Sequence, residues 1–477
     1  MAIDSEHPEY KNKKEQWEKL RDCVAGQESI HEKGVKYLPR LSGQSDNDYK
    51  AYKARAAFYN ATGRTVDGLS GMVFRKEPTI NVPAGLKPYL NDVTLNGMSL
   101  LGFAESIVDD AISVGRAGIL VDYPTTAAGV TRAQAEAANI RPFLKHYTAE
   151  NIFNWKVEGR NNSQVLTQVR LWEVAELPGD GEFEGVERKQ IRVLDLDAAG
   201  NYRQRVFIKV KTPAGEKWIQ DGDDIIALKK GAPLKEIPFF FVNVKNGTAN
   251  TEKAPLIDLA NINLSHYVST ADLEHGAHFT GLPTAVILGH QDVAEDGQNA
   301  QEYRIGAATA WVFPNPDTKV QYLEFNGQGL EALEKRIEKK EQQMAFLGAR
   351  MLQPEKAGIE AAQTLQIRQM GEVSVLASLT GAAGDAIEKA LAFMSDWAGF
   401  GDKVEFTLNK DFIAAAMSPQ ELTALLATWQ AGGMAFEDFL YNLKRGEIVR
   451  EERTAEDIRS EVETENPFKG EDMPPGE

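Results

Sequence analysis

The feature that most constrains the fold is an apolar stripe between residues 330 and 351. Large apolar side chains recur there at alternating steps of three and four residues, and only the turn of Lys340 and Glu341 interrupts them. This spacing predicts an amphipathic helix with one buried face. The stripe consists of Leu330, Leu333, Ile337, Met344, Leu347 and Met351.

The same helix contains a dense run of charges. Of the charges spaced four residues apart, only Glu331 and Lys335 attract each other, because the other such pairs repeat one sign. Single exposed charges usually add little to stability, so a solvated helix face is the plain interpretation. The run comprises Glu331, Glu334, Lys335, Arg336, Glu338, Lys339, Lys340 and Glu341.

A first helix and two short strands are expected before this charged helix. Pro255 is suited to a helix start, and an apolar stripe then continues to about His275. Strands are predicted at 284–288 and 309–313, with a polar, glycine-rich segment between them.

A third helix is expected after the charged one. Pro354 and Gly358 break the chain, and a helix over 359–397 follows that is long and rich in alanine and glycine. Each glycine inside a helix costs about 1 kcal/mol relative to alanine. The cluster of small residues therefore predicts either close approach by another segment or a kink.

Length and composition limit the class of protein. A chain of 477 residues exceeds what one hydrophobic core usually serves, so two or more subdomains are expected. The longest apolar runs are too short to span a membrane and residues 1–16 are polar, so we predict no membrane span and no signal peptide, and a cytosolic protein. The single cysteine, Cys23, excludes an internal disulfide framework and a multi-cysteine metal site.

The net charge of −17 argues against a generic nucleic-acid binder, because such binding depends on neutralising phosphates with Lys and Arg. Part of the excess lies in residues 451–477, which contain ten acidic and three basic residues. We expect an acidic, mobile tail over 464–477.

The first half of the chain changes from a helical to a β pattern. Helices are expected over 5–35, from about Asn47 to Met72, and over Ser99–Ser113, where Gly115 ends the helix. An apolar strand follows at 117–124. The period is two from residue 141 to 244, which predicts an antiparallel meander with strands at 143–147, 165–174, 190–196, 204–210, 216–219 and 237–244.

The last part of the chain is expected to be mostly helical. One strand is predicted at 404–408, followed by short helices at 419–430, 435–443 and 454–462. The fold class is therefore α+β with several domains.

Motifs for catalysis are weak. The chain has no glycine-rich nucleotide loop and no nucleophile elbow. His275 and His278, with Asp272 nearby, could bind a metal ion, but zinc-protease histidines lie four residues apart, not three. We predict no enzyme activity and no cofactor, and a metal-dependent hydrolase using these histidines stays as an alternative.

Three segments, together with the order of the elements, resemble the portal proteins of tailed bacteriophages. The resemblance covers about residues 46–458. Members of that family begin the long helix with Glu-Thr-Ala, whereas Ala361 stands here in place of the threonine, which leaves the capping of this helix open. The segments are TVDGLSGMVFRKEP at 65–78, SVGRAGILVDYP at 113–124 and EAAQTLQIRQMGE at 360–372.

This resemblance implies a multi-domain portal fold with a wing, two stem helices, a small αβ clip, a spine helix and a helical crown. The implied parts are an N-terminal arm and wing (1–254, with its β-rich part at about 141–244), stem helix 1 (255–279), clip (280–326), stem helix 2 (327–350), tunnel loop (351–358), spine helix with a return strand of the wing (359–417), crown (418–463) and acidic mobile tail (464–477).

The resemblance also implies partners. Portals form a closed ring of about twelve copies through head-to-tail contacts. Double-stranded DNA would pass through the ring without sequence specificity, and no membrane would be involved. The other implied partners are the terminase large subunit, the major capsid and scaffold proteins, and a head-completion or neck protein. The expected location is the virion, and the host cytoplasm during assembly.

Two hypotheses about residues follow from the resemblance. Lys356, with Gln353 and Glu355, would face DNA from the tunnel loop, although Lys356 could also be an ordinary solvated loop lysine. The charges of the second stem helix would pair between neighbouring subunits instead of within one helix. Those charges are Glu334, Lys335, Arg336, Glu338, Lys339 and Lys340.

Another virion structural or head-completion protein is the second alternative. A large ring would distinguish a portal from such a protein, and metal analysis of the purified protein would test the hydrolase.

Overall fold

The computed structural model describes residues 2–124, 134, 137–160, 162–178, 185–213, 215–281, 284–288, 317–323, 328–350, 375–412, 417, 419–446, 448–450 and 453–465. The chain divides into two compact units, Met1–Leu408 and Asn409–Glu477. Helices and antiparallel sheets both contribute, so the α+β class is confirmed. None of the described helices is long and apolar enough to cross a lipid bilayer.

The N-terminal helices are shorter than the sequence predicted. The expected arm is two helices, α1 (Pro8–Ala25) and α2 (Gln27–Lys33), followed by the 3₁₀ turn η1 (Gly34–Lys36). Gly26 between α1 and α2 has a φ of +94°, which glycine adopts without strain and which ends α1. The single long arm helix was therefore wrong.

The helix predicted from about Asn47 to Met72 is also two helices, α3 (Asp46–Arg55) and α4 (Ala61–Val73). The backbone of Ala56 is extended, which ends α3. The Oδ1 atom of Asn60 then accepts a hydrogen bond from the Gly63 amide at 2.9 Å, which caps the start of α4. This cap stabilises a new helix start and explains the break.

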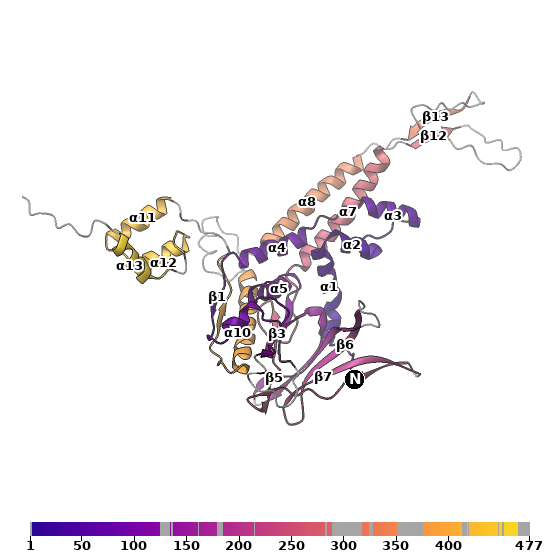
Figure 1. The fold of residues 1–477 in the computed structure, drawn as a ribbon. Helices are drawn as coiled ribbons and strands as arrows, with labels where there is room; N and C mark the ends of the chain where they lie inside the picture. Colours follow the sequence, from indigo (N-terminus) through magenta and orange to yellow (C-terminus); the bar gives the residue numbers. More distant parts are fainter. Residues whose placement is uncertain are drawn as a thin grey trace, which may run out of the picture. The chain divides into compact units, whose positions relative to one another are not determined.

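A three-stranded sheet with the order β11-β2-β3 lies in the first unit, and Figure 1 labels its strand β3. Its strands are β2 (Arg116–Asp122), β3 (Phe143–Thr148) and β11 (Phe239–Asn243). As predicted, α5 (Leu100–Ser113) precedes β2 and the chain turns at Gly115, where φ is +75°. Every residue of β2 is buried. We had placed β3 and β11 in the β-rich meander; they instead pair with β2 on either side.

The predicted meander is confirmed as a five-stranded antiparallel sheet in chain order. The strand β4 was missed: its pairing with β5 shifts register twice, so side chains do not alternate regularly along it. The strands are β4 (Ile152–Arg160), β5 (Ser163–Pro178), β6 (Gly185–Leu196), β7 (Tyr202–Thr212) and β8 (Gly215–Gln220).

Buried charges join β3 of the three-stranded sheet to β5 and β6 of the meander. The Glu173 carboxylate accepts hydrogen bonds from Lys145 Nζ at 2.5 Å and from Arg192 Nε at 2.9 Å. Tyr147 and Gln190 donate to the same carboxylate. Burial alone would raise the pKa of Glu173, but Arg192 and Lys145 lower it to about 2.

The stretch predicted around the apolar stripe contains α7 (Ile257–Gly281), β12 (Thr284–Leu288), β13 (Lys319–Leu323) and α8 (Gln328–Arg350). The helix α7 continues six residues past His275, where we had expected it to end. Strand β12 pairs with β13, a strand that we had not predicted. The strand predicted at 309–313 lies outside the described residues.

The remaining elements follow the sequence closely. Of the helix predicted over 359–397, the structure describes α10 (Val375–Trp397), and residues 359–374 lie outside the described residues. β14 (Glu405–Thr407) pairs with β1 (Thr79–Asn81). The second unit contains α11 (Pro419–Gln430), α12 (Phe436–Arg445) and α13 (Ala455–Glu465). Short elements are η2 (Lys87–Asn91), η3 (Ala149–Asn151), β9 (Leu228–Lys229) and β10 (Ala232–Pro233).

Candidate functional site

The helices α7 and α8 lie side by side, and the β12–β13 hairpin connects them at one end (Figure 1). Contacts between the two helices show that they run in opposite directions. The start of α8 is close to the end of α7, since Leu330 lies against Gly276. Further along, Lys340 reaches Ser269, and Leu347 shares a groove with Ile262. The site is thus an antiparallel helix pair.

The predicted apolar stripe of α8 faces α7. Met344 is only 3% exposed. Leu330, Leu333, Ile337 and Leu347 are half-buried, whereas the charged positions between them are mostly exposed. Met351 lies outside the described residues. The stripe therefore packs one face of α8 against α7 and leaves the other face to solvent.

Lys340, which interrupts the stripe in the sequence, also points toward α7. Its Nζ atom donates hydrogen bonds to the carbonyl oxygen of Ser265 at 2.8 Å and to Ser269 Oγ at 2.6 Å. Burial lowers the pKa of the Lys340 ammonium, and the nearby Arg336 cation lowers it further. Lys340 is thus engaged within its own chain.

The next residue adds a second polar contact between the helices. Glu341 Oε1 lies 3.3 Å from Nε2 of His266, whose side chain is 5% exposed. Together, Lys340 and Glu341 fix the register of α8 on α7, because a shift of one residue would leave these polar groups unpaired.

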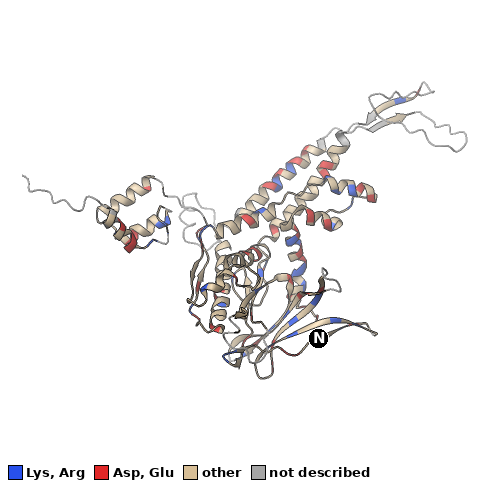
Figure 2. Ribbon diagram, in the orientation of Figure 1, with Lys and Arg blue, Asp and Glu red and all other residues tan. Residues whose placement is uncertain are grey.

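The charged residues of α8 from Glu331 to Lys339 are exposed, and Figure 2 shows acidic and basic residues interspersed along this helix. Lys335 and Glu331 form the ion pair predicted from their spacing, with a distance of 2.6 Å. Within the described part of the chain, no ion pair is formed by the exposed Glu334, Arg336, Glu338 or Lys339. Their pairing between subunits stays a prediction.

An open groove of about 340 Å³ lies along one side of the helix pair. Phe346 in its wall is 59% exposed, an unusual exposure for a phenylalanine. The sequence analysis missed this groove. Phe346 could have been noticed as a large apolar residue outside the stripe, but the partner helix could not. The lining residues are Ile262, Lys339, Gln342, Gln343, Phe346 and Leu347.

Other helices of the same chain pack against α7. The helices α1, α3 and α4 all contact it, and Figure 1 shows α7 between α8 and α3. Tyr52 Oη of α3 donates to Asp272 at 2.7 Å. Asn263 Oδ1 accepts from both the amide and the hydroxyl of Thr62 in α4. These contacts cover α7 with the chain's own helices, whereas the groove stays open.

The candidate metal site looks unfavourable for a cation. Nδ1 of His275 lies 3.5 Å from the Arg55 guanidinium. Burial and then the Arg55 charge lower the pKa of His275. In the described ranges, no group of three or more His, Cys, Asp or Glu side chains is arranged to hold a metal ion. A fixed guanidinium beside His275 opposes a metal ion there.

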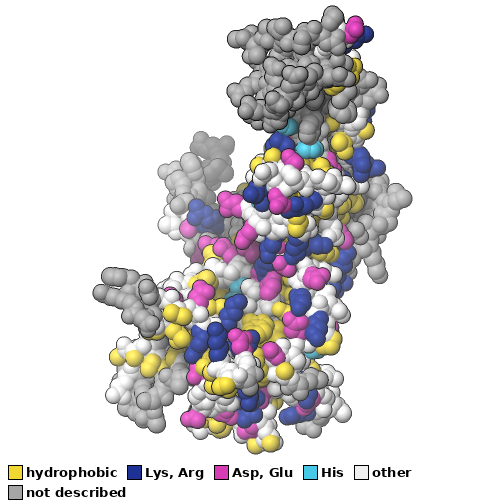
Figure 3. Space-filling view, turned by 90° about the vertical axis from the view of Figure 1, so that its right-hand side faces the viewer, with side chains coloured by type: hydrophobic (Ala, Val, Ile, Leu, Met, Phe, Trp, Pro, Cys, Tyr) yellow, Lys and Arg dark blue, Asp and Glu magenta, His cyan; other side chains and the backbone are white. Residues whose placement is uncertain are grey.

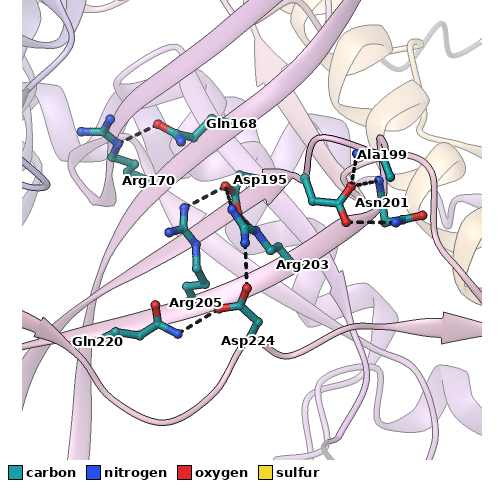
Figure 4. Close-up of polar contacts among 10 residues, drawn as sticks. Gln168, Arg170, Asp195, Ala199, Asn201, Arg203, Arg205, Gln220 and Asp224 are labelled. Atoms are coloured by element: carbon teal, nitrogen blue, oxygen red, sulfur yellow. Dashed lines mark hydrogen bonds and ion pairs between the residues drawn. The ribbon is translucent and has the colours of Figure 1, made fainter.

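Strands β6 and β7 of the five-stranded sheet, with Asp224 after β8, hold another cluster of charges (Figure 4). Asp195 accepts two hydrogen bonds from Arg203, at 3.2 and 3.1 Å, and one from Arg205 at 2.7 Å. Arg203 also donates to Asp224 at 2.7 Å. The acids and arginines neutralise each other across adjacent strands, so this cluster ties the sheet together.

The predicted tunnel-loop residues Gln353, Glu355 and Lys356 lie outside the described residues, as does most of the predicted clip between β12 and β13. The structure therefore places the charges predicted for the second stem helix on α8, whereas the predicted tunnel loop (351–358) lies outside the described residues.

Comparisons with known proteins give limited matches. A family model described as "Domain of unknown function (DUF4055)" matches residues 255–398, less than half of the chain. No curated protein matches the chain significantly.

Two chains of solved structures match at 13% identity, each covering 84% of this chain and 92% of the other. One is from the neck of an empty GTA particle computed with C6 symmetry, with a TM-score of 0.37. The other is from the neck of a native GTA particle computed with C12 symmetry, with a TM-score of 0.38. At these scores the superpositions do not establish a shared fold.

Proposed function

We propose that this chain is a phage portal protein, which forms a ring at one capsid vertex and conducts DNA during packaging and ejection. The observation that supports this best is the antiparallel α7–α8 pair, joined by a hairpin, at the position that the sequence resemblance assigns to the stem. This pair has a groove open to solvent, and several exposed charges of α8 form no ion pair with a described residue, which suits a helix pair that packs against identical neighbours.

In this proposal, the segment between β12 and β13 belongs to the clip, where the terminase motor and later a neck protein would bind. Lys356, Gln353 and Glu355 would face the DNA. The ring would assemble with capsid and scaffold proteins in the host cytoplasm and remain in the virion.

The test is the mass and shape of the purified protein. We expect native mass measurement to find a particle about twelve times the 52.7 kDa chain, and negative-stain images to show a ring with a central hole. A monomer without rings under all assembly conditions would overturn the portal function. It would leave the alternative of another virion structural or head-completion protein.

The proposed pairing of stem charges between subunits has its own test. Because about 1 M salt shortens the screening length to about 3 Å, exposed ion pairs weaken strongly in it. We expect the ring to lose subunits between 0.1 M and 1 M NaCl. A ring that is equally stable in both would argue against this pairing.

A further inference from the structure

Residues 2–7, which precede α1, are held against the five-stranded sheet by side chains of that sheet. Arg170 Nη1 on β5 donates a hydrogen bond to the carbonyl oxygen of Ala2 at 3.2 Å. Asn154 Nδ2 on β4 donates to the carbonyl oxygen of Ser5 at 2.6 Å. We name residues 2–7 the N-terminal segment. It is bound to the sheet by separate side-chain contacts, which can open without disrupting the strand pairing.

His7 joins the N-terminal segment to α1. Its backbone amide donates to the carbonyl oxygen of Phe153 at 2.9 Å, and its imidazole stacks on the indole of Trp155 with the ring centroids 3.9 Å apart. Its Nδ1 atom accepts a hydrogen bond from the Glu9 amide at 3.3 Å, which caps the start of α1. This cap requires a neutral imidazole, because both ring nitrogens of a protonated histidine are donors.

A buried cation lies near the same indole. The guanidinium carbon of Arg116 on β2 is 4.4 Å from the centroid of the Trp155 ring, and Arg116 is only 1% exposed. Its Nη1 atom donates to Asn243 Oδ1 and to the carbonyl oxygen of Asn250. In the described part of the chain, its Nε and Nη2 atoms have no hydrogen-bond partner. A positive charge on His7 would therefore add to one that is already poorly compensated.

The charged groups around His7 favour its neutral form. Burial lowers the pKa of His7, and the Arg116 charge also lowers it, against an opposite effect of the Glu9 carboxylate. Glu6, the preceding residue, forms an ion pair with Lys14 at 3.0 Å. The β4 side chain that stacks on the imidazole is uncharged. The docked segment thus binds a proton at His7 less readily than a released segment would.

Glu9 connects this part of the chain to the segment that leads into α7. Its Oε2 atom accepts hydrogen bonds from the amide of Thr251 at 2.6 Å and from the Thr251 hydroxyl at 2.9 Å. Thr251 and Asn250 both lie between β11 and α7. Glu9 and Arg116 therefore hold the connection into α7, and Glu9 does so from the first turn of α1.

We infer that His7 is a pH-sensitive switch: its neutral form docks the N-terminal segment on the sheet, and its protonation releases the segment and loosens the connection into α7. Protonation removes the acceptor that caps α1 and places a second cation near Arg116. Because the released state binds the proton first, docking is complete above about pH 6.5 and weakens as the pH falls below it. The switch belongs to a single chain and does not depend on the proposed ring.

The relevant pH range changes few other charges. Histidine is the side chain that ordinarily titrates between pH 5 and 8, and the chain has seven histidines against 70 acidic residues. On the face shown in Figure 3, histidine side chains cover small parts of a surface that is rich in acidic and basic ones. A step from pH 7.5 to pH 5.5 therefore acts mainly on histidines.

Hydrogen exchange of the full chain at pH 7.5 and pH 5.5 tests the switch. The His7 amide reports docking of the N-terminal segment, and the Thr251 amide reports the connection into α7. After correction for intrinsic exchange, we expect the protection of peptides spanning 2–10 and 246–256 to fall at pH 5.5. The limit is about tenfold, because pH 5.5 lies one unit below the pKa of 6.5 in the released state. A peptide from α10 should keep its protection.

His7→Asn is the variant that isolates the titrating group. Asparagine is a good N-cap residue and does not titrate, so the variant should show the same protection of residues 2–10 at both pH values. His278→Asn is the matched control, because His278 is an exposed histidine near the other end of α7. Its exchange should depend on pH as in the natural chain. Unfolding midpoints of both variants separate a local release from a general loss of stability.

Equal protection of residues 2–10 at pH 7.5 and pH 5.5 in the natural chain would overturn the switch. The same fall in His7→Asn as in the natural chain would also overturn it, because another group would then be responsible. A fall confined to residues 2–10 would overturn the coupling to α7. A chain that forms no rings would contradict the portal proposal and leave this test intact.

Discussion

Charged side chains are paired to different extents in the β-sheets of the first unit and in the α7–α8 pair. In the sheets, the buried Glu173 is held by Arg192 and Lys145, and the pairing is complete within one chain. On α8, Lys340 is satisfied by α7, but Lys339 beside it is exposed and forms no ion pair with a described residue. The sheet charges therefore serve the fold of the chain, whereas the outer charges of α8 are available to another surface.

Among the substitutions that test this difference, Arg192→Met should cause the largest loss of unfolding free energy. It leaves the Glu173 carboxylate buried with less positive charge around it, which should reduce the free energy of unfolding by about 3–5 kcal/mol. Urea unfolding measures the change. Glu331→Gln, which removes an exposed ion pair of α8, is the control and should change stability by less than about 0.5 kcal/mol. Equal losses of unfolding free energy in Arg192→Met and Glu331→Gln would contradict the difference between the sheet charges and the outer charges of α8.

Acid should weaken the sheets through Glu173. Its pKa is about 2 in the folded chain and 4.5 ordinarily, so the unfolded state binds a proton first as the pH falls. The stabilisation is complete above about pH 4.5 and is lost as the pH falls through about 2, for a total on the order of 3 kcal/mol.

Unfolding free energies measured from pH 5 to pH 2.5 test this expectation. The variant Glu173→Gln lacks the titrating group, so its stability should fall less steeply over this range. The same slope in both proteins would assign the acid sensitivity to other carboxylates.

The substitution Met344→Ala should separate the inner and outer faces of α8. Met344 is 3% exposed, so the loss of its side chain should cost about 2–3 kcal/mol. Phe346→Ala, two residues away, should cost under about 1 kcal/mol in the monomer because Phe346 is mostly exposed. Hydrogen exchange of the α7 and α8 amides reports the local change. A larger loss from Phe346→Ala would mean that the groove is closed within the monomer.

The smallest expected effect comes from Lys340→Met. The methionine keeps most of the side-chain volume but removes the hydrogen bonds to Ser265 and Ser269, at a cost of about 1 kcal/mol. Lys339→Met, which removes an exposed charge, should change monomer stability by less than about 0.5 kcal/mol. Thermal unfolding of both variants provides the measurement, and identical midpoints would show that the contacts of Lys340 add nothing.

Local patterns predicted the elements that have regular spacing. The apolar stripe at 330–351 predicted most of α8 because it follows the helical period, and the resemblance implied bounds of 327–350 that differ from those of α8 by at most one residue. Strand β4 was missed because two register shifts break the alternation that identifies a strand. The pairing of β2 with β11 joins residues more than a hundred positions apart, and no local pattern contains that information.

The candidate site was predictable only in part. The sequence identified the charged residues of α8, and their spacing gave the Glu331–Lys335 ion pair. It treated Lys339 and Lys340 alike, although one is exposed and the other is bonded to α7. Their difference depends on where α7 lies around α8, which is a tertiary relation. The groove was missed for the same reason, because half of it belongs to α7.

Gly276 of α7 lies directly against Leu330 of α8, near the end of the helix pair that leads to β12 and β13. Packed helices usually have axes about 8–10 Å apart, whereas paired strands lie about 4.8 Å apart, so the two chain segments must converge between helices and strands. A Cβ atom at position 276 would lie 2.7 Å from Leu330 Cδ2. That methyl group ends a flexible side chain, so Leu330 can adjust to a small residue at this position, whereas a bulky residue would hold α7 and α8 apart near the strands.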